Sequence, residues 1–198
     1  MGTLVDISGN GNNGTIVGAV SSEDGMKFNG SSDTISLVGG SVDLGINSTI
    51  CFRCKPTTLT GNRQILGEGT YSSDWVVHFS STQVWFRIGT IFDTISHALK
   101  LDQFQNFVIS RTGDAAILYI NGINVGAYSG YGIVIHTLFD TIGSDQNMDT
   151  FFSGEIADLK GFNYAFSEQE AIDYHNSFQK LEKRGNFALD FGVGDTIG

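Results

Sequence analysis

Apolar and polar residues alternate along most of the chain, which is the pattern of half-buried β-strands. The alternation is clearest where Ile35 and Leu37 stand between polar residues, and it returns at residues 49–55, 107–111 and 116–120. Segments rich in glycine, asparagine and serine separate these runs and supply the residues that tight turns require. About ten such strands predict an antiparallel sandwich or jelly roll.

Two hairpins and one helix have local signals of their own. Residues 75–79 and 84–88 are apolar runs on either side of a short polar turn. Asn121-Gly122 stands between two further apolar runs, and Asn-Gly is the strongest short hairpin signal. Ser167 and Glu170 form a capping box, which predicts one short helix near the end of the domain.

The last segment, residues 179–198, differs in composition from the domain at residues 1–178. A charged stretch comes first, and then Phe187, Leu189 and Phe191 alternate with small or polar residues. This alternation fits a last strand of the sandwich. It fits equally an arm that docks on the sheet edge of a neighbouring subunit.

Length and charge limit the classes of function. The 198 residues suit one well-cored domain, and the formal net charge is −10. The acidic excess argues against nucleic-acid binding, which requires clusters of Lys and Arg, and is compatible with a cation, a sugar or a basic partner. No run of 18 apolar residues occurs, so we expect no membrane span. The first residues lack the basic and apolar regions of a signal peptide.

The only two cysteines, Cys51 and Cys54, form a C-x-x-C pair within an expected strand. Residues three apart on a strand point to opposite faces, so we expect two separate thiols rather than a metal or redox pair. Zinc would also require a second pair of ligands, and the four histidines are scattered singly.

Several short motifs occur in the order in which one known family carries them. They are Asp6-x-Ser8-Gly9-Asn10-Gly11, Phe28-Asn29-Gly30, Ser48-Thr49-Ile50, Phe104-Gln105-Asn106-Phe107-Val108, Leu118-Tyr119-Ile120-Asn121-Gly122 and Gly154-Glu155-Ile156. Over about residues 6–178 the chain therefore resembles the laminin-G-like, concanavalin A-like lectin and glucanase domains. The resemblance implies an all-β fold, a concanavalin A-like antiparallel β-sandwich (jelly roll) with one short C-terminal helix. Phe104, where the family usually has Trp, and the missing Arg before Ala165 depart from the pattern.

The resemblance also implies a calcium site, since many relatives bind Ca²⁺ on the convex face. Its ligands would be Asp6 and Asn10 from the opening loop and Asp158 from the last long strand, because Ca²⁺ takes hard oxygen ligands. The alternative is that Asp6 and Asn10 hold the turn through side-chain to backbone hydrogen bonds. Asp158 would then accept hydrogen bonds from N–H groups of the loop.

Exposed aromatic side chains are the candidates for a sugar site, because the C–H faces of sugars stack on aromatic rings. The candidates are Tyr71, Trp75, Tyr128 and Tyr131, and the last two flank a glycine in an expected loop. For Trp85, which stands within an alternating strand, we expect core packing instead.

The family also includes glycoside hydrolases, which need two carboxylates across a cleft. Their Glu-x-Asp-x-(x)-Glu signature is missing from this sequence, so we expect a non-catalytic binding or structural module. The first hypothesis is a virus or phage decoration or tail protein that contacts glycans or neighbouring subunits and assembles through residues 179–198. The second is a secreted bacterial carbohydrate-binding module, and the third is a glycoside hydrolase.

Overall fold

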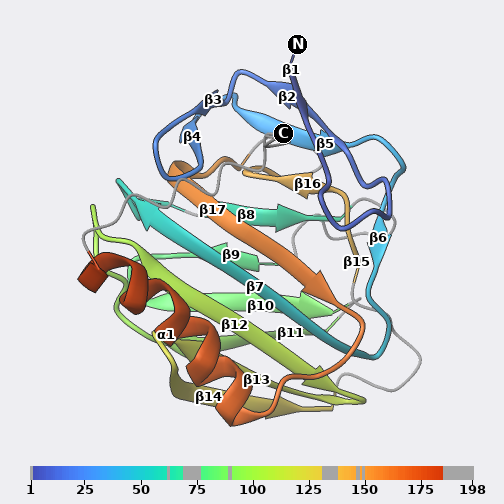
Figure 1. Ribbon diagram of the computed structural model, residues 1–198, viewed down its shortest axis with the longest axis vertical. Helices are drawn as coiled ribbons and strands as arrows, with labels where there is room; N and C mark the ends of the chain where they lie inside the picture. Colours follow the sequence, from blue (N-terminus) through green and yellow to red (C-terminus); the bar gives the residue numbers. More distant parts are fainter. Residues whose placement is uncertain are drawn as a thin grey trace.

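The structure is a computed structural model that describes residues 2–61, 63–68, 77–88, 91–130, 138–145, 148 and 150–184. Two antiparallel sheets lie face to face, and one helix covers part of the outer side of one sheet (Figure 1). This confirms the expected all-β sandwich with a single C-terminal helix. Among the described residues, no helix has the length and apolar character that crossing a membrane requires.

The eight-stranded sheet has the order β1-β2-β5-β16-β8-β9-β10-β11. Its strands are β1 (Gly2–Leu4), β2 (Gly14–Val17), β5 (Thr34–Leu37), β16 (Thr141–Ile142), β8 (Arg63–Gly67), β9 (Val77–Phe79), β10 (Gln83–Ile88) and β11 (Ile91–Ser96). The first predicted hairpin is confirmed, since β9 and β10 pair antiparallel with Phe79 opposite Val84.

The seven-stranded sheet has the order β14-β13-β12-β7-β17-β4-β3. Its strands are β14 (Ile123–Ser129), β13 (Ala115–Ile120), β12 (Gln105–Thr112), β7 (Asn47–Pro56), β17 (Ser153–Phe162), β4 (Met26–Asn29) and β3 (Val20–Ser21), while β6 (Val42–Asp43) and β15 (Leu138–Phe139) pair with each other. The Asn-Gly hairpin is also confirmed. Asn121 and Gly122 have φ values of 54° and 76°, as a tight turn between β13 and β14 requires.

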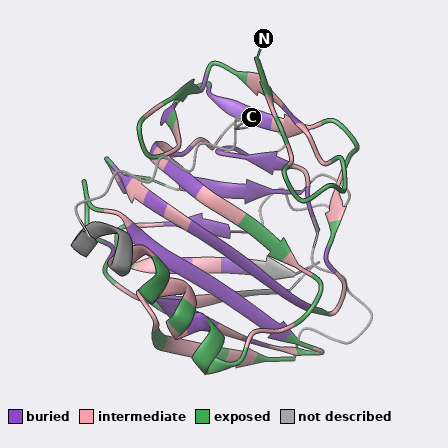
Figure 2. Ribbon diagram, viewed as in Figure 1, coloured by how far each residue is buried: buried purple, intermediate pink, exposed green. Residues whose placement is uncertain are grey.

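The main core lies between the two sheets, whose central strands are largely buried (Figure 2). At its centre the rings of Phe52 and Phe107 stack with centroids 4.9 Å apart, and Phe79 from the opposite sheet lies 5.0 Å from Phe107. The alternation seen in the sequence thus places one face of each central strand in this aromatic core.

The two sheets meet along one side of the sandwich, where edge strands β11 and β14 are in contact. The contact is tight at Gly126, because a Cβ atom there would lie 2.7 Å from the Cδ1 atom of Ile95. The opposite edge strands are β1 and β3.

Helix α1 (Glu168–Arg184) is longer than the short helix expected from the sequence. The proposed domain boundary at residue 178 therefore falls inside the helix. The capping box is confirmed, since the Ser167 N–H and hydroxyl both donate to the Glu170 carboxylate. Residues 185–198, with the alternating part of the tail, lie outside the described residues.

A second, smaller core lies between α1 and the outer face of the seven-stranded sheet. Ala171 of the helix packs there with Cys51, Val108 and Tyr119 of the sheet. Cys51 faces this cluster, whereas Cys54 faces the main core, and both are buried free thiols. This confirms that the two cysteines point to opposite faces of one strand.

Candidate functional site

A row of polar and aromatic side chains crosses the outer face of the eight-stranded sheet. Gln64 on β8 is opposite His78 on β9, His78 is opposite Trp85 on β10, and Trp85 is opposite Thr94 on β11. We call these four residues the polar row. Their side chains must point outward, because their strand neighbours, such as Val77, Phe79, Val84 and Phe86, lie in the main core.

The polar row becomes more accessible from β8 toward β11. Gln64 and His78 are buried, whereas Trp85 and Thr94 are half-buried. Gln83, which is half-buried, and Ser96, which is exposed, form the next pair on the same face. The accessible part therefore includes an indole ring with amide and hydroxyl groups beside it.

The buried part of the polar row is closely packed and uncharged at neutral pH. The rings of His78 and Trp85 have centroids 5.8 Å apart and planes inclined by 48°. Burial lowers the pKa of His78 to about 4, although the negative charge of Asp145 opposes this shift. The Gln64 amide donates to the Leu66 carbonyl, while its buried Oε1 atom has no hydrogen-bond partner among the described residues. Because Gln64 and His78 are buried, a ligand could reach only the accessible part of the polar row, Trp85 and Thr94.

The expected aromatic site is only partly covered by the structure. Tyr71, Trp75 and Tyr131 lie outside the described residues. Tyr128 does not lie in a loop, because it belongs to β14, and it packs edge-on against the core residue Phe86 with centroids 5.4 Å apart. Core packing thus accounts for the position of this ring.

The expectation of core packing for Trp85 was wrong. The core positions of β10 are Val84 and Phe86, and the intervening Trp85 faces outward beside His78. His78, Gln64 and Thr94 were not identified from the sequence at all. One sequence pattern could have identified His78. In both Val77-His78-Phe79 and Val84-Trp85-Phe86, an aromatic ring stands between two apolar residues that lie in the core.

The opening loop uses its polar side chains to hold its own backbone. The two carboxylate oxygens of Asp6 accept hydrogen bonds from the backbone N–H groups of Ser8 and Asn12, at 2.8 Å each. The amide of exposed Asn10 donates to the Ser8 hydroxyl. Partial burial raises the pKa of Asp6, but the hydrogen bonds from Ser8 and Asn12 outweigh it and leave the pKa lowered. This is the turn-holding arrangement considered above.

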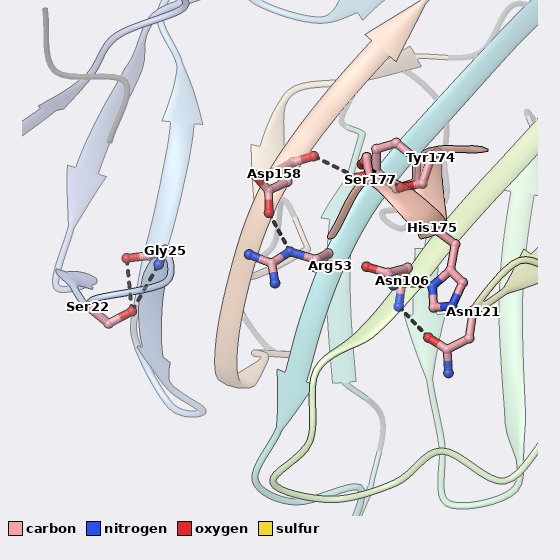
Figure 3. A network of polar contacts seen from close by, with 9 residues as sticks. All are labelled: Ser22, Gly25, Arg53, Asn106, Asn121, Asp158, Tyr174, His175 and Ser177. Carbon is pink, nitrogen blue, oxygen red and sulfur yellow. Dashed lines mark hydrogen bonds and ion pairs between the residues drawn. The ribbon is translucent and has the colours of Figure 1, made fainter. Parts of the chain in front are cut away.

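Asp158 belongs to a different network, on the outer face of the seven-stranded sheet beneath α1 (Figure 3). Its carboxylate pairs with Arg53 at 2.5 Å, and its carbonyl accepts a hydrogen bond from the Tyr174 hydroxyl. The Arg53 guanidinium lies between the rings of Phe104 and Phe178, 4.8 Å and 4.6 Å from their centroids. This network attaches α1 to the sheet through Tyr174 and Phe178.

These three residues do not fit one calcium site. Asp6 and Asn10 lie in the loop between β1 and β2 of one sheet, whereas the Asp158 carboxylate on the other sheet is occupied by Arg53. The described residues contain no group of three or more His, Cys, Asp and Glu side chains that could hold a metal ion. Calcium binding stays a prediction without a site in this part of the chain.

His175 fastens the first half of α1 to the same sheet. Its Nδ1 atom lies 2.6 Å from the Asn106 amide nitrogen, and the Asn106 backbone N–H donates to the Asn121 side chain (Figure 3). A Cβ atom on Gly122 would lie 3.3 Å from the Cβ of His175, so the helix packs directly on the β13–β14 turn. The contacts that Figure 3 shows beneath α1 thus attach the helix to the sheet.

Comparisons with known proteins agree with this architecture. Residues 29–171 match the family model described as the concanavalin A-like lectin/glucanases superfamily. A search of curated protein sequences finds no match.

Solved structures share the fold at low sequence identity. Domain 4 of AbnA, an extracellular arabinanase from Geobacillus stearothermophilus, in complex with arabinotriose, is 18% identical, with a TM-score of 0.70 over 86% of this chain and 91% of that chain. The botulinum neurotoxin serotype D binding domain is 16% identical, with a TM-score of 0.67 over 88% of this chain and 51% of that chain. A mutant Trypanosoma rangeli sialidase is 12% identical, with a TM-score of 0.64 over 85% of this chain and 30% of that chain.

Proposed function

Because the chain belongs to the concanavalin A-like lectin/glucanases superfamily, we propose that it is a non-catalytic module that binds a glycan on the outer face of its eight-stranded sheet. The observation that carries this proposal is the polar row, with Trp85 as its accessible aromatic ring. An aromatic surface with a few fixed polar groups is the usual composition of a small-molecule site. The indole would stack on a sugar ring, and Gln83, Thr94 and Ser96 would bind its hydroxyl groups.

The chemistry of the polar row also supports binding rather than hydrolysis. Glycoside hydrolysis needs a carboxylic acid and a second carboxylate on either side of the scissile bond. The four residues of the polar row and its neighbours Gln83 and Ser96 include no carboxylate. These groups can recognise hydroxyls, but they cannot supply an acid and a nucleophile.

One similar structure suggests a first ligand to try. Domain 4 of the arabinanase AbnA was solved in complex with arabinotriose, and this chain matches 91% of its length. Arabinotriose is therefore the first probe, followed by an array of plant, bacterial and animal glycans.

Replacing Trp85 by alanine is expected to weaken glycan binding at least tenfold, which corresponds to about 1.4 kcal/mol, because the stacking surface is lost. The measurement is calorimetric titration with arabinotriose or with the best glycan from the array. Tyr164→Ala, which removes an exposed ring from the connection between β17 and α1, is the matched control and should leave the affinity unchanged. Equal affinity of the Trp85 variant and the unmodified protein would rule out this surface. Release of reducing sugar from the bound glycan would rule out the non-catalytic assignment.

We also propose the setting of a virus or phage particle, where such a module contacts glycans or neighbouring subunits and where residues 179–198 contribute to assembly. The alternating apolar pattern of residues 187–193 supports this, since it suits a strand added to another subunit. A secreted bacterial carbohydrate-binding module is the alternative setting. It would bind the same glycans as a monomer.

A further inference from the structure

Exposed aliphatic side chains gather in the N-terminal part of the sandwich. Val5, Ile7 and Val38 are 60%, 75% and 67% exposed. Together with Val17 and Val20 they are five of the nine large hydrophobic residues that are exposed in the described part of the chain. All five are β-branched, a type of residue that favours packing between strands. We call Val5, Ile7 and Val38 the aliphatic patch.

Hydrogen bonds hold the two loops of the aliphatic patch side by side. The Val38 N–H donates to the Asn13 carbonyl at 2.8 Å, and the Asp6 N–H donates to the Asn13 side chain at 2.9 Å. The Asp6 carboxylate, the only charge within these loops, is turned toward its own backbone. The patch is therefore preformed, and its local charge is already satisfied by hydrogen bonds.

The aliphatic patch lies next to an open sheet edge. Strand β1 pairs only with β2 among the described residues, and Gly2 and Thr3 are exposed. An edge strand presents unpaired N–H and C=O groups that can pair with another strand. Natural edges are commonly protected by charged residues or proline, but Gly2-Thr3-Leu4 contains neither.

The same chain carries a segment suited to this edge. In the tail, Phe187, Leu189, Phe191 and Val193 alternate with small residues and one aspartate, and there is no proline. As a strand, residues 187–193 would place all four apolar side chains on one face.

We propose that residues 187–193 of a second copy of this chain add to β1 as a strand and cover the aliphatic patch. This names the receiving surface of the assembly role proposed above, and it is independent of glycan binding. The covering strand is assigned to a second copy because α1 ends at Arg184 on the side of the sandwich away from β1 (Figure 1), and only residues 185 and 186 separate it from this segment. The contact joins two different surfaces, so it is head-to-tail and can close a ring or continue into a filament.

The test is the mass of the full-length protein in solution, measured by light scattering. The unmodified chain is expected to assemble, and Val38→Asp is expected to shift the midpoint concentration of assembly upward at least tenfold. Ile123→Asp is the matched control, because Ile123 on β14 is also 67% exposed and the added charge is the same. A chain ending at Arg184, which keeps every described element, should be monomeric.

A synthetic peptide of residues 185–198 adds a second measurement. It is expected to dissociate the full-length assembly and to bind the chain ending at Arg184, but not the same chain with Val38→Asp. A monomeric full-length protein, or equal assembly of the Val38 and Ile123 variants, would overturn the proposal. Arabinotriose or array binding by the same variants separates the two proposals, because Val38→Asp should leave glycan affinity unchanged.

Discussion

Replacing Phe52 by alanine is expected to lower the free energy of unfolding by about 3–5 kcal/mol, the usual cost of removing a buried phenylalanine ring. Phe52 is fully buried, stacks on Phe107 at 4.9 Å with nearly parallel planes, and lies 6.4 Å from Phe79 of the opposite sheet. The lost ring would leave a cavity between the two sheets, where the rigid strands cannot close it. Because domains are stable by only about 5–15 kcal/mol, this single change would remove a large part of the total.

Urea unfolding followed by tryptophan fluorescence and circular dichroism measures this effect. Leu101→Ala is the control, since Leu101 is exposed, and a change within about 0.5 kcal/mol is expected there. A loss below about 1 kcal/mol for the Phe52 variant would contradict a close-packed aromatic core between the sheets.

Acid is expected to destabilise the protein through His78, well above the pH at which carboxylates titrate. Burial lowers the pKa of His78 from its ordinary 6.5 to about 4, so below pH 6.5 the unfolded chain binds a proton that the folded chain does not. Stability due to His78 is therefore complete above pH 6.5 and is lost as the pH falls toward 4. The total loss is about 3 kcal/mol, at about 1.4 kcal/mol for each unit of pKa difference.

The measurement is the urea midpoint between pH 7 and pH 4.5 for the unmodified protein and for His78→Gln. Glutamine keeps a polar side chain at this buried position but does not titrate, so most of the slope should vanish. Burial also lowers the pKa of His97, and His97→Gln therefore serves as the control that should retain most of the slope. Partial burial raises the pKa of Glu155, but Lys55 and Ser22 outweigh this effect and leave the pKa lowered. Glu155 therefore adds to the slope only below its ordinary pKa of 4.5. An unchanged slope in the His78 variant would show that this imidazole is solvated.

The fold followed from short-range patterns that act within a few residues. Alternation located the central strands, the Asn121-Gly122 turn located one hairpin, and Ser167 with Glu170 located the start of α1. The end of α1 was missed because the charged residues 180–184 read as a change of domain. Lysine, glutamate and arginine are good helix formers, and the helix simply continues through them to Arg184.

The candidate site depends on long-range register, which a single sequence does not specify. The sequence assigns Trp85 to an alternating strand. Whether its side chain faces the core or the solvent depends on which residues of the strand pack into the core, and these are Val84 and Phe86. Gln64 reaches the polar row only because β8 pairs with β9. The three residues expected at a calcium site lie apart for the same reason, since the Asp158 carboxylate pairs with Arg53 on the neighbouring strand β7.

The thiols of Cys51 and Cys54 on β7 can report two different openings of the structure. Burial raises the pKa of Cys51 to about 12 and that of Cys54 well above its ordinary value, so neither thiol is reactive in the closed protein. Cys51 lies beneath α1, and Cys54 lies between the sheets. Labelling of Cys51 thus follows detachment of the helix, while labelling of Cys54 requires the sandwich itself to open. The two labelling rates, compared in the same sample, give the free energies of these two openings separately.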